Sequence, residues 1–207
     1  MAKLALIRHG QSEWNAKGLW TGWTDIALSE KGVAEAREAA KVLVDVKFEV
    51  AFCSCLWRAQ QTLHEVLTEL GTINIPGYLS PALNERNYGD MTGKNKWEIK
   101  EKYGDEQFLA WRRGWDVPIP NGETLKGVYE RVLPYYLEHI LPELKAGHNV
   151  VLSAHGNTLR ALIKYLDKVP DDGIDKVEVG TGEVWLYDIG QDGEVVSKKV
   201  LVAGGQA

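Results

Sequence analysis

The sequence has few cysteines, no long apolar run and no excess of positive charge. Only two of its 207 residues are cysteines, Cys53 and Cys55. Two thiolates are too few for a four-thiolate zinc site, and two positions apart on a strand they are poorly placed for an unstrained disulfide. We therefore interpret both as small buried hydrophobic side chains of a protein that resides in a reducing compartment.

Membranes and nucleic acids are not expected as partners. No apolar run approaches the roughly 20 residues that span a bilayer, and Met1-Ala2-Lys3 leads directly into the first apolar segment, which leaves no room for a signal peptide. We therefore expect a cytoplasmic location. The formal net charge of -5 argues against nucleic-acid binding, which needs a basic surface. It still allows a small anionic substrate, because a local cationic pocket can dominate the field at that place.

Composition and element order predict one α/β domain over residues 1–207. Hydrophobic residues make up 44% and charged residues 26% of the chain, which is typical of a folded globular protein. Apolar strands alternate with amphipathic helices, so we expect a three-layer fold in which helices flank a mixed, mostly parallel sheet. Strands are expected at 4–7, 49–54, 78–83, 150–154, 184–189 and 195–202, and main helices at 28–44, 56–70, 125–144 and 156–166.

Local signals add detail to this picture. Ser29 is the expected N-cap of the 28–44 helix, and Pro134 is expected to bend the 125–144 helix. The glycine-containing turn at 190–193 predicts a hairpin, so the last two strands should be antiparallel. Residues 94–113 are expected to form short helices within a lid-like insertion at about 88–121.

Two of the predicted strands end in a histidine that is followed by glycine. The first leads into Arg8-His9-Gly10 and the other into His155-Gly156-Asn157. Either histidine alone would be interpreted as an ordinary loop residue. In α/β sheets, however, ligands bind beyond the carboxyl ends of parallel strands. Two imidazoles at that edge, one of them beside Arg8, indicate an anionic substrate and a histidine that takes part in chemistry.

The two strands between them add an arginine and a glutamate. Arg58 follows the second strand, and its planar guanidinium matches phosphate oxygens in a bidentate manner. Glu85 follows the third strand. Its spacing alone leaves open whether it forms a structural ion pair or takes part in catalysis. A dianionic phosphate nearby would favour the protonated carboxyl and make it a usable proton donor.

A larger set of segments carries a family resemblance. These are Arg8-His9-Gly10, Arg58, Asn84 to Gly89, Lys96, Trp111-Arg112-Arg113 and His155-Gly156-Asn157. Together they resemble the bisphosphoglycerate-dependent phosphoglycerate mutases of the histidine phosphatase superfamily, over nearly the whole chain from Leu4 to about Lys198. The Arg-His-Gly triplet is moderately specific for the superfamily, whereas the block from Asn84 to Gly89, with Lys96 and the Trp-Arg-Arg triplet, is highly specific for the mutases.

The resemblance implies an isomerase of glycolysis and gluconeogenesis. It would interconvert 3-phosphoglycerate and 2-phosphoglycerate through phosphorylated His9, with 2,3-bisphosphoglycerate as the phosphoryl primer and no metal. Glu85 would serve as acid and base, and Arg8, Arg58 and His155 would bind the phosphoryl oxygens. The implied substrate-binding residues are Asn15, Thr21, Gly22, Tyr88, Lys96, Arg112, Arg113 and Asn157.

Some positions depart from the family pattern. Asn87 stands where the family usually has His or Tyr, so we assign it no role. The chain between Arg113 and Glu123 is short, as in compact members, which leaves open whether the protein is a homo-oligomer or a monomer. The end at 203–207 lacks a lysine-rich tail, so we expect a detectable bisphosphoglycerate phosphatase side activity.

Three other functions compete with this interpretation. The nearest is a histidine phosphatase that hydrolyses small phosphomonoesters on the same scaffold. A metalloenzyme with His9, His155 and Glu85 as a facial triad is disfavoured, because Arg8 and Arg58 would repel the cation. A non-catalytic binding module is disfavoured further, because every group that the chemistry needs is present.

Overall fold

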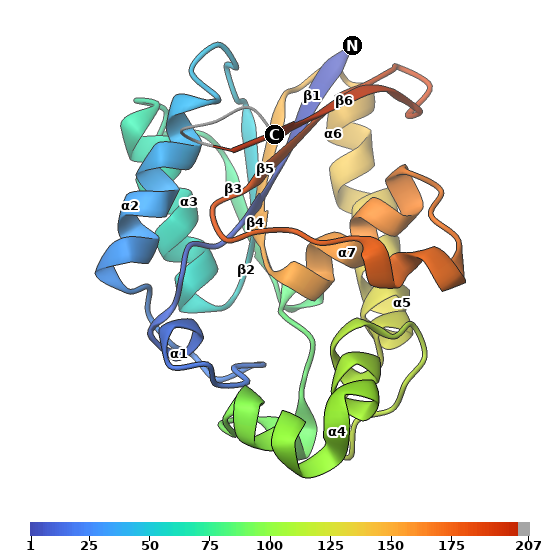
Figure 1. The fold of residues 1–207 in the computed structure, drawn as a ribbon. Coiled ribbons are helices and arrows are strands. Elements are labelled where there is room, and N and C mark those ends of the chain that lie inside the picture. The colour runs from blue at the N-terminus through green and yellow to red at the C-terminus, as the bar shows by residue number, and fades with distance from the viewer. Residues whose placement is uncertain (203–207) are drawn as a thin grey trace.

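A sheet with the strand order β3-β2-β4-β1-β5-β6 forms the middle layer of the computed structural model, which describes residues 1–202 (Figure 1). Strands β1 to β4 run parallel, whereas β5 pairs antiparallel with both β1 and β6, so the predicted mixed, mostly parallel sheet is confirmed. The strands are β1 (Ala2–Arg8), β2 (Val50–Ser54), β3 (Gly77–Ser80), β4 (Val150–Ala154), β5 (Val184–Ile189) and β6 (Val195–Leu201).

Helices cover both faces of this sheet (Figure 1). One face carries α2 (Glu30–Lys41) and α3 (Trp57–Glu69). The other carries α5 (Leu125–Tyr135), α6 (Leu141–Lys145) and α7 (Gly156–Leu166). The helices α1 (Glu13–Ala16) and α4 (Lys96–Arg113) lie at the end of the molecule where β1 ends (Figure 1).

The strands are apolar on both faces because each face packs against a helical layer. In β1, Leu4 and Leu6 belong to the core that includes α5 and α7, whereas Ala5 and Ile7 belong to the core under α2 and α3. All four side chains are fully buried. This explains why β1 is a continuous apolar run, as expected for a central strand that is covered on both sides.

The helix signals in the sequence act where they were expected. Ser29 caps α2 and its hydroxyl accepts a hydrogen bond from Gly32 N at 3.2 Å. Pro134 lies near the end of α5, and a π-helical turn at Tyr136–Ile140 follows before α6 begins. The expected 125–144 helix therefore exists, and its regular geometry is interrupted just after the proline, as a residue that lacks the backbone donor requires.

Two predictions were wrong in detail. Cys53 is buried, but Cys55 is exposed, and both thiols are free. Cys55 lies one residue beyond the end of β2, so the alternation of the strand no longer holds it. The third strand is shorter than expected, because β3 ends at Ser80 and a 3-10 helix at Pro81–Leu83 continues the chain.

The segment around α4 has a small core of its own. Trp20 packs there with Met91, Ile99, Phe108, Trp111 and Ile119. Gly104 interrupts α4 with a φ of 81°, so residues 96–113 form two short helices, as predicted. Among residues 1–202, none of the helices has the length and apolar character needed to cross a membrane. The tail at 203–207, from which a side activity was expected, lies outside the described residues.

Candidate active site

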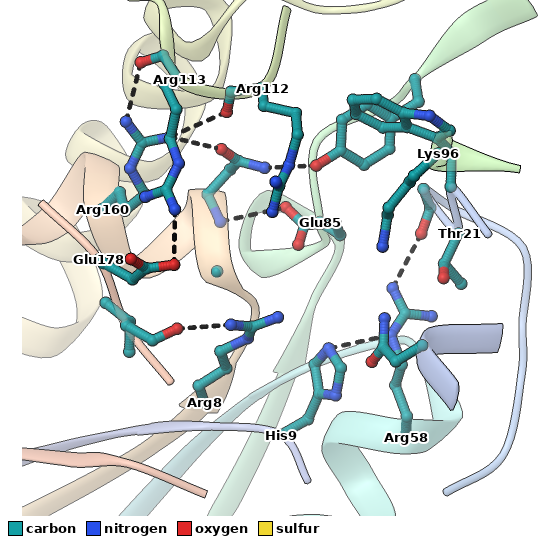
Figure 2. Close-up of a pocket in the computed structure, with 17 residues that line it drawn as sticks. Arg8, His9, Thr21, Arg58, Glu85, Lys96, Arg112, Arg113, Arg160 and Glu178 are labelled. Atoms are coloured by element: carbon teal, nitrogen blue, oxygen red, sulfur yellow. Dashed lines mark hydrogen bonds and ion pairs between the residues drawn. The ribbon is translucent and has the colours of Figure 1, made fainter. Parts of the chain in front are cut away.

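A pocket of about 710 Å³, part of it open solvent, lies beyond the carboxyl ends of β1, β2 and β4 (Figure 2). Every catalytic and substrate-binding residue predicted from the sequence lines it, except His155, which is fully buried beside it. The rings of His155 and His9 meet edge to face, with their centroids 5.0 Å apart. The pocket is also lined by five residues to which the sequence analysis gave no role, namely Trp20, Gly156, Arg160, Glu178 and Val179.

Gly10 lets the loop after β1 pass directly over the start of α2. A Cβ atom at this position would lie 2.1 Å from the carbonyl oxygen of Gly32, which no side chain tolerates. The Gly10 amide donates to Thr62 Oγ1 at 3.1 Å. The glycine of the Arg-His-Gly triplet is therefore needed for a close backbone contact, and this contact fixes where His9 lies.

The hydrogen bonds of His9 define which ring nitrogen can react. His9 Nδ1 lies 2.7 Å from the carbonyl oxygen of Gly10, which can only accept, so Nδ1 carries the proton. Arg58 Nε donates to His9 Nε2 at 3.3 Å. Nε2 therefore presents its lone pair and is the nitrogen available for nucleophilic attack.

Burial keeps the imidazole of His9 neutral. His9 is 3% exposed, and burial, followed by the charges of Arg58 and Arg8, holds its pKa well below the usual value. Arg58 itself stays charged at neutral pH, because burial lowers its pKa only to about 10. The site thus combines an uncharged nucleophile with permanent positive charge beside it.

His155 is oriented by a chain of hydrogen bonds that fixes its tautomer. Asn84 Oδ1 accepts from both Cys55 N and Ser54 Oγ, so the one hydroxyl proton of Ser54 points to Asn84. Ser54 Oγ must then accept from His155 Nε2 at 2.8 Å, so Nε2 carries the proton. Nδ1 of His155 is buried and has no partner within residues 1–202. Burial and the charge of Arg58 lower the pKa of His155, so this nitrogen is an acceptor until a ligand brings negative charge.

Glu85 lies in the middle of the pocket and is rigidly held (Figure 2). Its Oε1 accepts from the amides of Arg86 at 2.7 Å and Asn157 at 3.3 Å. Its carbonyl oxygen accepts from Trp23 Nε1 and Arg131 Nη2. Both hydrogen bonds that the carboxylate makes within residues 1–202 fall on Oε1, which leaves Oε2 for a ligand.

The loop after α1 supplies the next part of the wall. Asn15 forms a capping box with Ser12 and lines the pocket with its side chain. Gly22 has a φ of 54°, and its carbonyl oxygen accepts from Arg58 Nη2 at 2.8 Å. The hydroxyl of Thr21 is buried without a partner in the described part of the chain.

The cations of the pocket form two groups (Figure 2). Arg8 and Arg58 lie beside His9, and we call them the inner cations. Lys96, Arg112 and Arg113 come from α4, and we call them the outer cations. Burial, followed by the charges of Arg112 and Arg8, lowers the pKa of Lys96 to about 8.

Tyr88 and Asn157 close the pocket between the two groups. Asn157 Nδ2 donates to Tyr88 Oη at 2.7 Å, so the phenolic proton of Tyr88 remains free to donate elsewhere. Burial raises the pKa of Tyr88 to about 12, which keeps the phenol neutral. With Arg160, the lining carries six cations against two carboxylates, although the chain as a whole has a net charge of -5.

Arg160 is a residue that the sequence analysis missed. It is buried and donates to the carbonyl oxygens of Arg113 at 2.9 Å and Ile174 at 2.7 Å, and to Asn157 Oδ1 at 3.0 Å. It therefore joins α7 to the end of α4, which carries two of the outer cations. Arg160 lies three positions after Asn157 in a predicted helix, so both side chains share one face. This spacing could have indicated that Arg160 lies near the pocket.

The donors left unpaired in the pocket match an anionic ligand with several oxygens. Arg8 Nε and Thr21 Oγ1 are buried and have no partner within residues 1–202. Unpaired buried donors are costly, and they are expected where a ligand completes the hydrogen bonding. Within the same residues, no three His, Cys, Asp or Glu side chains converge as metal ligands would.

Comparison with known proteins agrees with this geometry. Residues 4–200 match the family model of the histidine phosphatase superfamily (branch 1). The chain is 51% identical to a 2,3-bisphosphoglycerate-dependent phosphoglycerate mutase of Rhodopseudomonas palustris, over 94% of this chain and 95% of the relative. It is 47% identical to one of Parvibaculum lavamentivorans, over 96% of each chain.

Among solved structures, the fold is similar to two phosphatases. A mycobacterial glucosyl-3-phosphoglycerate phosphatase matches with a TM-score of 0.81 and 26% identity over the full length of both chains. A putative alpha-ribazole-5'-P phosphatase from Escherichia coli matches with a TM-score of 0.79 and 28% identity, over 100% of this chain and 97% of the other. The near full-length identity to the mutases is much higher, and the chain therefore belongs to the 2,3-bisphosphoglycerate-dependent phosphoglycerate mutases of the histidine phosphatase superfamily.

Proposed function

We propose that this protein interconverts 3-phosphoglycerate and 2-phosphoglycerate through a phosphohistidine at His9, primed by 2,3-bisphosphoglycerate. The observation that carries the proposal is the presence of outer cations opposite the inner cations. A phosphatase needs to hold only the phosphate that it removes. A mutase must also hold the other anionic end of its ligand while the phosphoryl group is on the enzyme, and the outer cations can do this.

The inner part of the site suits phosphoryl transfer to nitrogen. His9 Nε2 forms the bond to phosphorus as the bond from phosphorus to the glycerate oxygen breaks. The inner cations and the Nδ1 side of His155 surround the phosphoryl oxygens and stabilise the charge that they carry. When His155 takes up a proton at Nδ1, both of its ring nitrogens become donors, which suits a dianionic group.

Glu85 is the proposed acid and base. Its free Oε2 can give a proton to the glycerate oxygen that leaves and take one from the hydroxyl that later attacks phosphorylated His9. The two backbone amides on Oε1 hold the carboxyl in place during both steps. Such a positioned group is worth about 10²- to 10⁴-fold in rate.

The residues present fit the phosphoryl primer. When bound, 2,3-bisphosphoglycerate would supply the phosphoryl group that charges His9. Arg8 Nε and Thr21 Oγ1 are buried donors that await acceptors, and they lie on the same pocket as the outer cations. The pocket therefore offers separate contacts for two phosphates and a carboxylate, as a bisphosphorylated acid requires.

We also propose that residues 88–121 act as a lid on a single catalytic domain. This segment packs around its own small core and supplies Tyr88 and all the outer cations to the pocket. Its main helix is broken at Gly104, which adopts a positive φ that glycine tolerates because it has no Cβ atom. Closure by such a segment would keep water from phosphorylated His9.

The second candidate function is hydrolysis of small phosphomonoesters. The similar solved structures favour it, since both are named as phosphatases. They share the fold of this chain at 26% and 28% identity. Hydrolysis would need only a nucleophile and cations around one phosphate, which His9 and the inner cations supply.

One assay separates the two functions. The protein is given 3-phosphoglycerate with and without 2,3-bisphosphoglycerate, in the presence of EDTA, and 2-phosphoglycerate and inorganic phosphate are both measured. A mutase forms 2-phosphoglycerate only when primed and releases little phosphate. Release of phosphate without 2-phosphoglycerate would identify a phosphatase, and loss of activity in EDTA that Mn²⁺ or Zn²⁺ restores would contradict both.

A further inference from the structure

Residues 177–179 cross the rim of the pocket and occupy two of its arginines. Arg8 Nη1 donates to the carbonyl oxygen of Val179 at 2.5 Å, and Arg113 Nη1 donates to that of Val177 at 3.4 Å. Arg113 Nη2 forms an ion pair with Glu178 Oε1, also at 2.5 Å. One inner cation, Arg8, and one outer cation, Arg113, therefore already donate hydrogen bonds to residues 177–179, and these donors are not free for a ligand.

Glu178 is a carboxylate in a pocket built for anions. The lining contains one other acid, Glu85, which is buried in the middle and has a proposed catalytic role. Glu178 lies at the rim with its side chain 69% exposed, in a segment that belongs to neither a helix nor a strand. Neither the core nor the secondary structure requires an acid here, and the side-chain contact of its carboxylate is with Arg113 of the pocket lining.

The carboxylate of Glu178 remains charged under working conditions. Its hydrogen bond to Arg113 lowers its pKa below the usual value, and the charges of Arg113, Arg112 and Arg8 add to this. A ligand that reaches Arg113 therefore meets a negative charge already bound to the same guanidinium (Figure 2).

We propose that Glu178 is a specificity-determining residue whose carboxylate competes with the outer phosphate of a ligand for Arg113. The inference rests on the proposed function, because it takes Arg113 as a contact for the outer end of the ligand. An incoming group must displace Glu178 or lie beside it, and the cost rises with the charge of that group. Glu178 thus weakens ligands with two phosphates more than ligands with one phosphate and a carboxylate.

This bias has a use in a mutase. The bisphosphorylated ligand must turn within the pocket, or leave and return, before its other phosphate reaches His9. If both phosphates were bound too tightly, the ligand would be held in one orientation. Glu178 repels the outer phosphate, so the contacts of this phosphate are weaker than those of the inner phosphate. The outer end of the ligand therefore dissociates first.

The test is equilibrium binding, by titration calorimetry, of three ligands to the full-length protein with His9→Ala, which cannot accept the phosphoryl group, and to the same protein with Glu178→Gln added. The ligands are 2,3-bisphosphoglycerate, 3-phosphoglycerate and inorganic phosphate. Glutamine keeps the size and the hydrogen bond to Arg113 but removes the charge. We expect Kd to fall about 5- to 20-fold for the bisphosphate and about 2-fold for 3-phosphoglycerate, and to change less than about 2-fold for phosphate.

Two controls separate this effect from a general change of charge. Glu138→Gln makes the same change at an exposed position outside the pocket and should leave all three affinities unchanged. In an Arg113→Gln background, Glu178→Gln should change bisphosphate binding less than about 2-fold, because the group for which it competes is gone.

The inference fails if Glu178→Gln changes the three affinities equally, changes none of them or weakens bisphosphate binding. It also fails if the effect persists in the Arg113→Gln background, or if neither form binds the bisphosphate. Because binding is measured on protein that cannot be phosphorylated at residue 9, the expected pattern together with an unmodified protein that does not isomerise phosphoglycerate contradicts the proposed function alone. A protein that isomerises without the pattern contradicts only the role of Glu178.

Discussion

The charge of Lys96 should make substrate affinity depend on pH in the mildly alkaline range. Burial, with the charges of Arg112 and Arg8, lowers the pKa of Lys96 to about 8 in the ligand-free protein. The ammonium form is the one that binds an anion. Below pH 8 most of the protein carries this charge, and above pH 8 the charge is progressively lost. Raising the pH therefore weakens binding, and lowering it does not.

The size of the effect follows from the pKa. With a value of about 8, the charged fraction of Lys96 falls from roughly 0.9 at pH 7 to roughly 0.1 at pH 9. If only this form binds, KM for 3-phosphoglycerate should rise about tenfold between these pH values. Phosphate monoesters lose their second proton near pH 6, so the ligand itself hardly titrates in this window. Because Lys96 is proposed to bind the outer end of the ligand, away from the reacting phosphoryl group, kcat should change much less.

The assay is a set of steady-state measurements between pH 6.5 and 9.5 on the whole protein and on Lys96→Arg. The guanidinium stays charged throughout, so KM of this variant should be nearly constant across the range. Calorimetry of bisphosphoglycerate binding near pH 8, in buffers of different ionisation enthalpy and in a His9→Ala background that prevents phosphoryl transfer, should show about half a proton more taken up with Lys96 than with Lys96→Arg. A flat KM profile in the unmodified protein, or a rise that persists in Lys96→Arg, would refute the reasoning.

Three substitutions test the inner site. His9→Ala should abolish both mutase turnover and acid-labile phosphate on the protein, whereas stable labelling of His155 in this variant would show that the two roles are reversed. Glu85→Gln should leave affinity almost unchanged and slow turnover by about 10²- to 10⁴-fold; weak binding with full turnover would make it a structural anchor. Ser54→Ala should lower kcat about tenfold by removing a hydrogen bond to His155, with a changed tautomer ratio in ¹⁵N NMR, and an unchanged ratio and rate would contradict this.

The parts of the site that lie at strand ends could be predicted from the sequence. His9 and His155 each follow a continuous apolar strand, and parallel strands bring their carboxyl ends to one edge. The strand, the glycine and the polar residue are neighbours in the sequence, so short motifs contain most of the information. The order of elements was likewise enough to predict the sheet and its two helical layers.

Contacts between distant segments could not be predicted in this way. Arg160 binds the carbonyl oxygen of Arg113, and Glu178 pairs with the side chain of the same residue, although both lie far along the chain from it. Neither contact has a local pattern, because each depends on how α4 packs against the segments that follow β4. Cys55 shows the same limit at short range. Whether its side chain is buried depends on whether the strand includes residue 55, and β2 ends one residue before it.

The separation of inner and outer cations also bears on how such an enzyme can change its substrate. The inner cations lie at the end of β1 and the start of α3 and are fixed by the sheet, whereas all the outer cations belong to α4, on the two short helices that meet at Gly104. Mutations confined to residues 88–121 could therefore remodel which phosphorylated compound is accepted without disturbing the histidine that receives the phosphoryl group. The scaffold thus combines a reaction centre that the sheet fixes with a segment that selects the ligand and can be exchanged. A chimera that carries residues 88–121 from a related phosphatase would have the ligand preference of that enzyme.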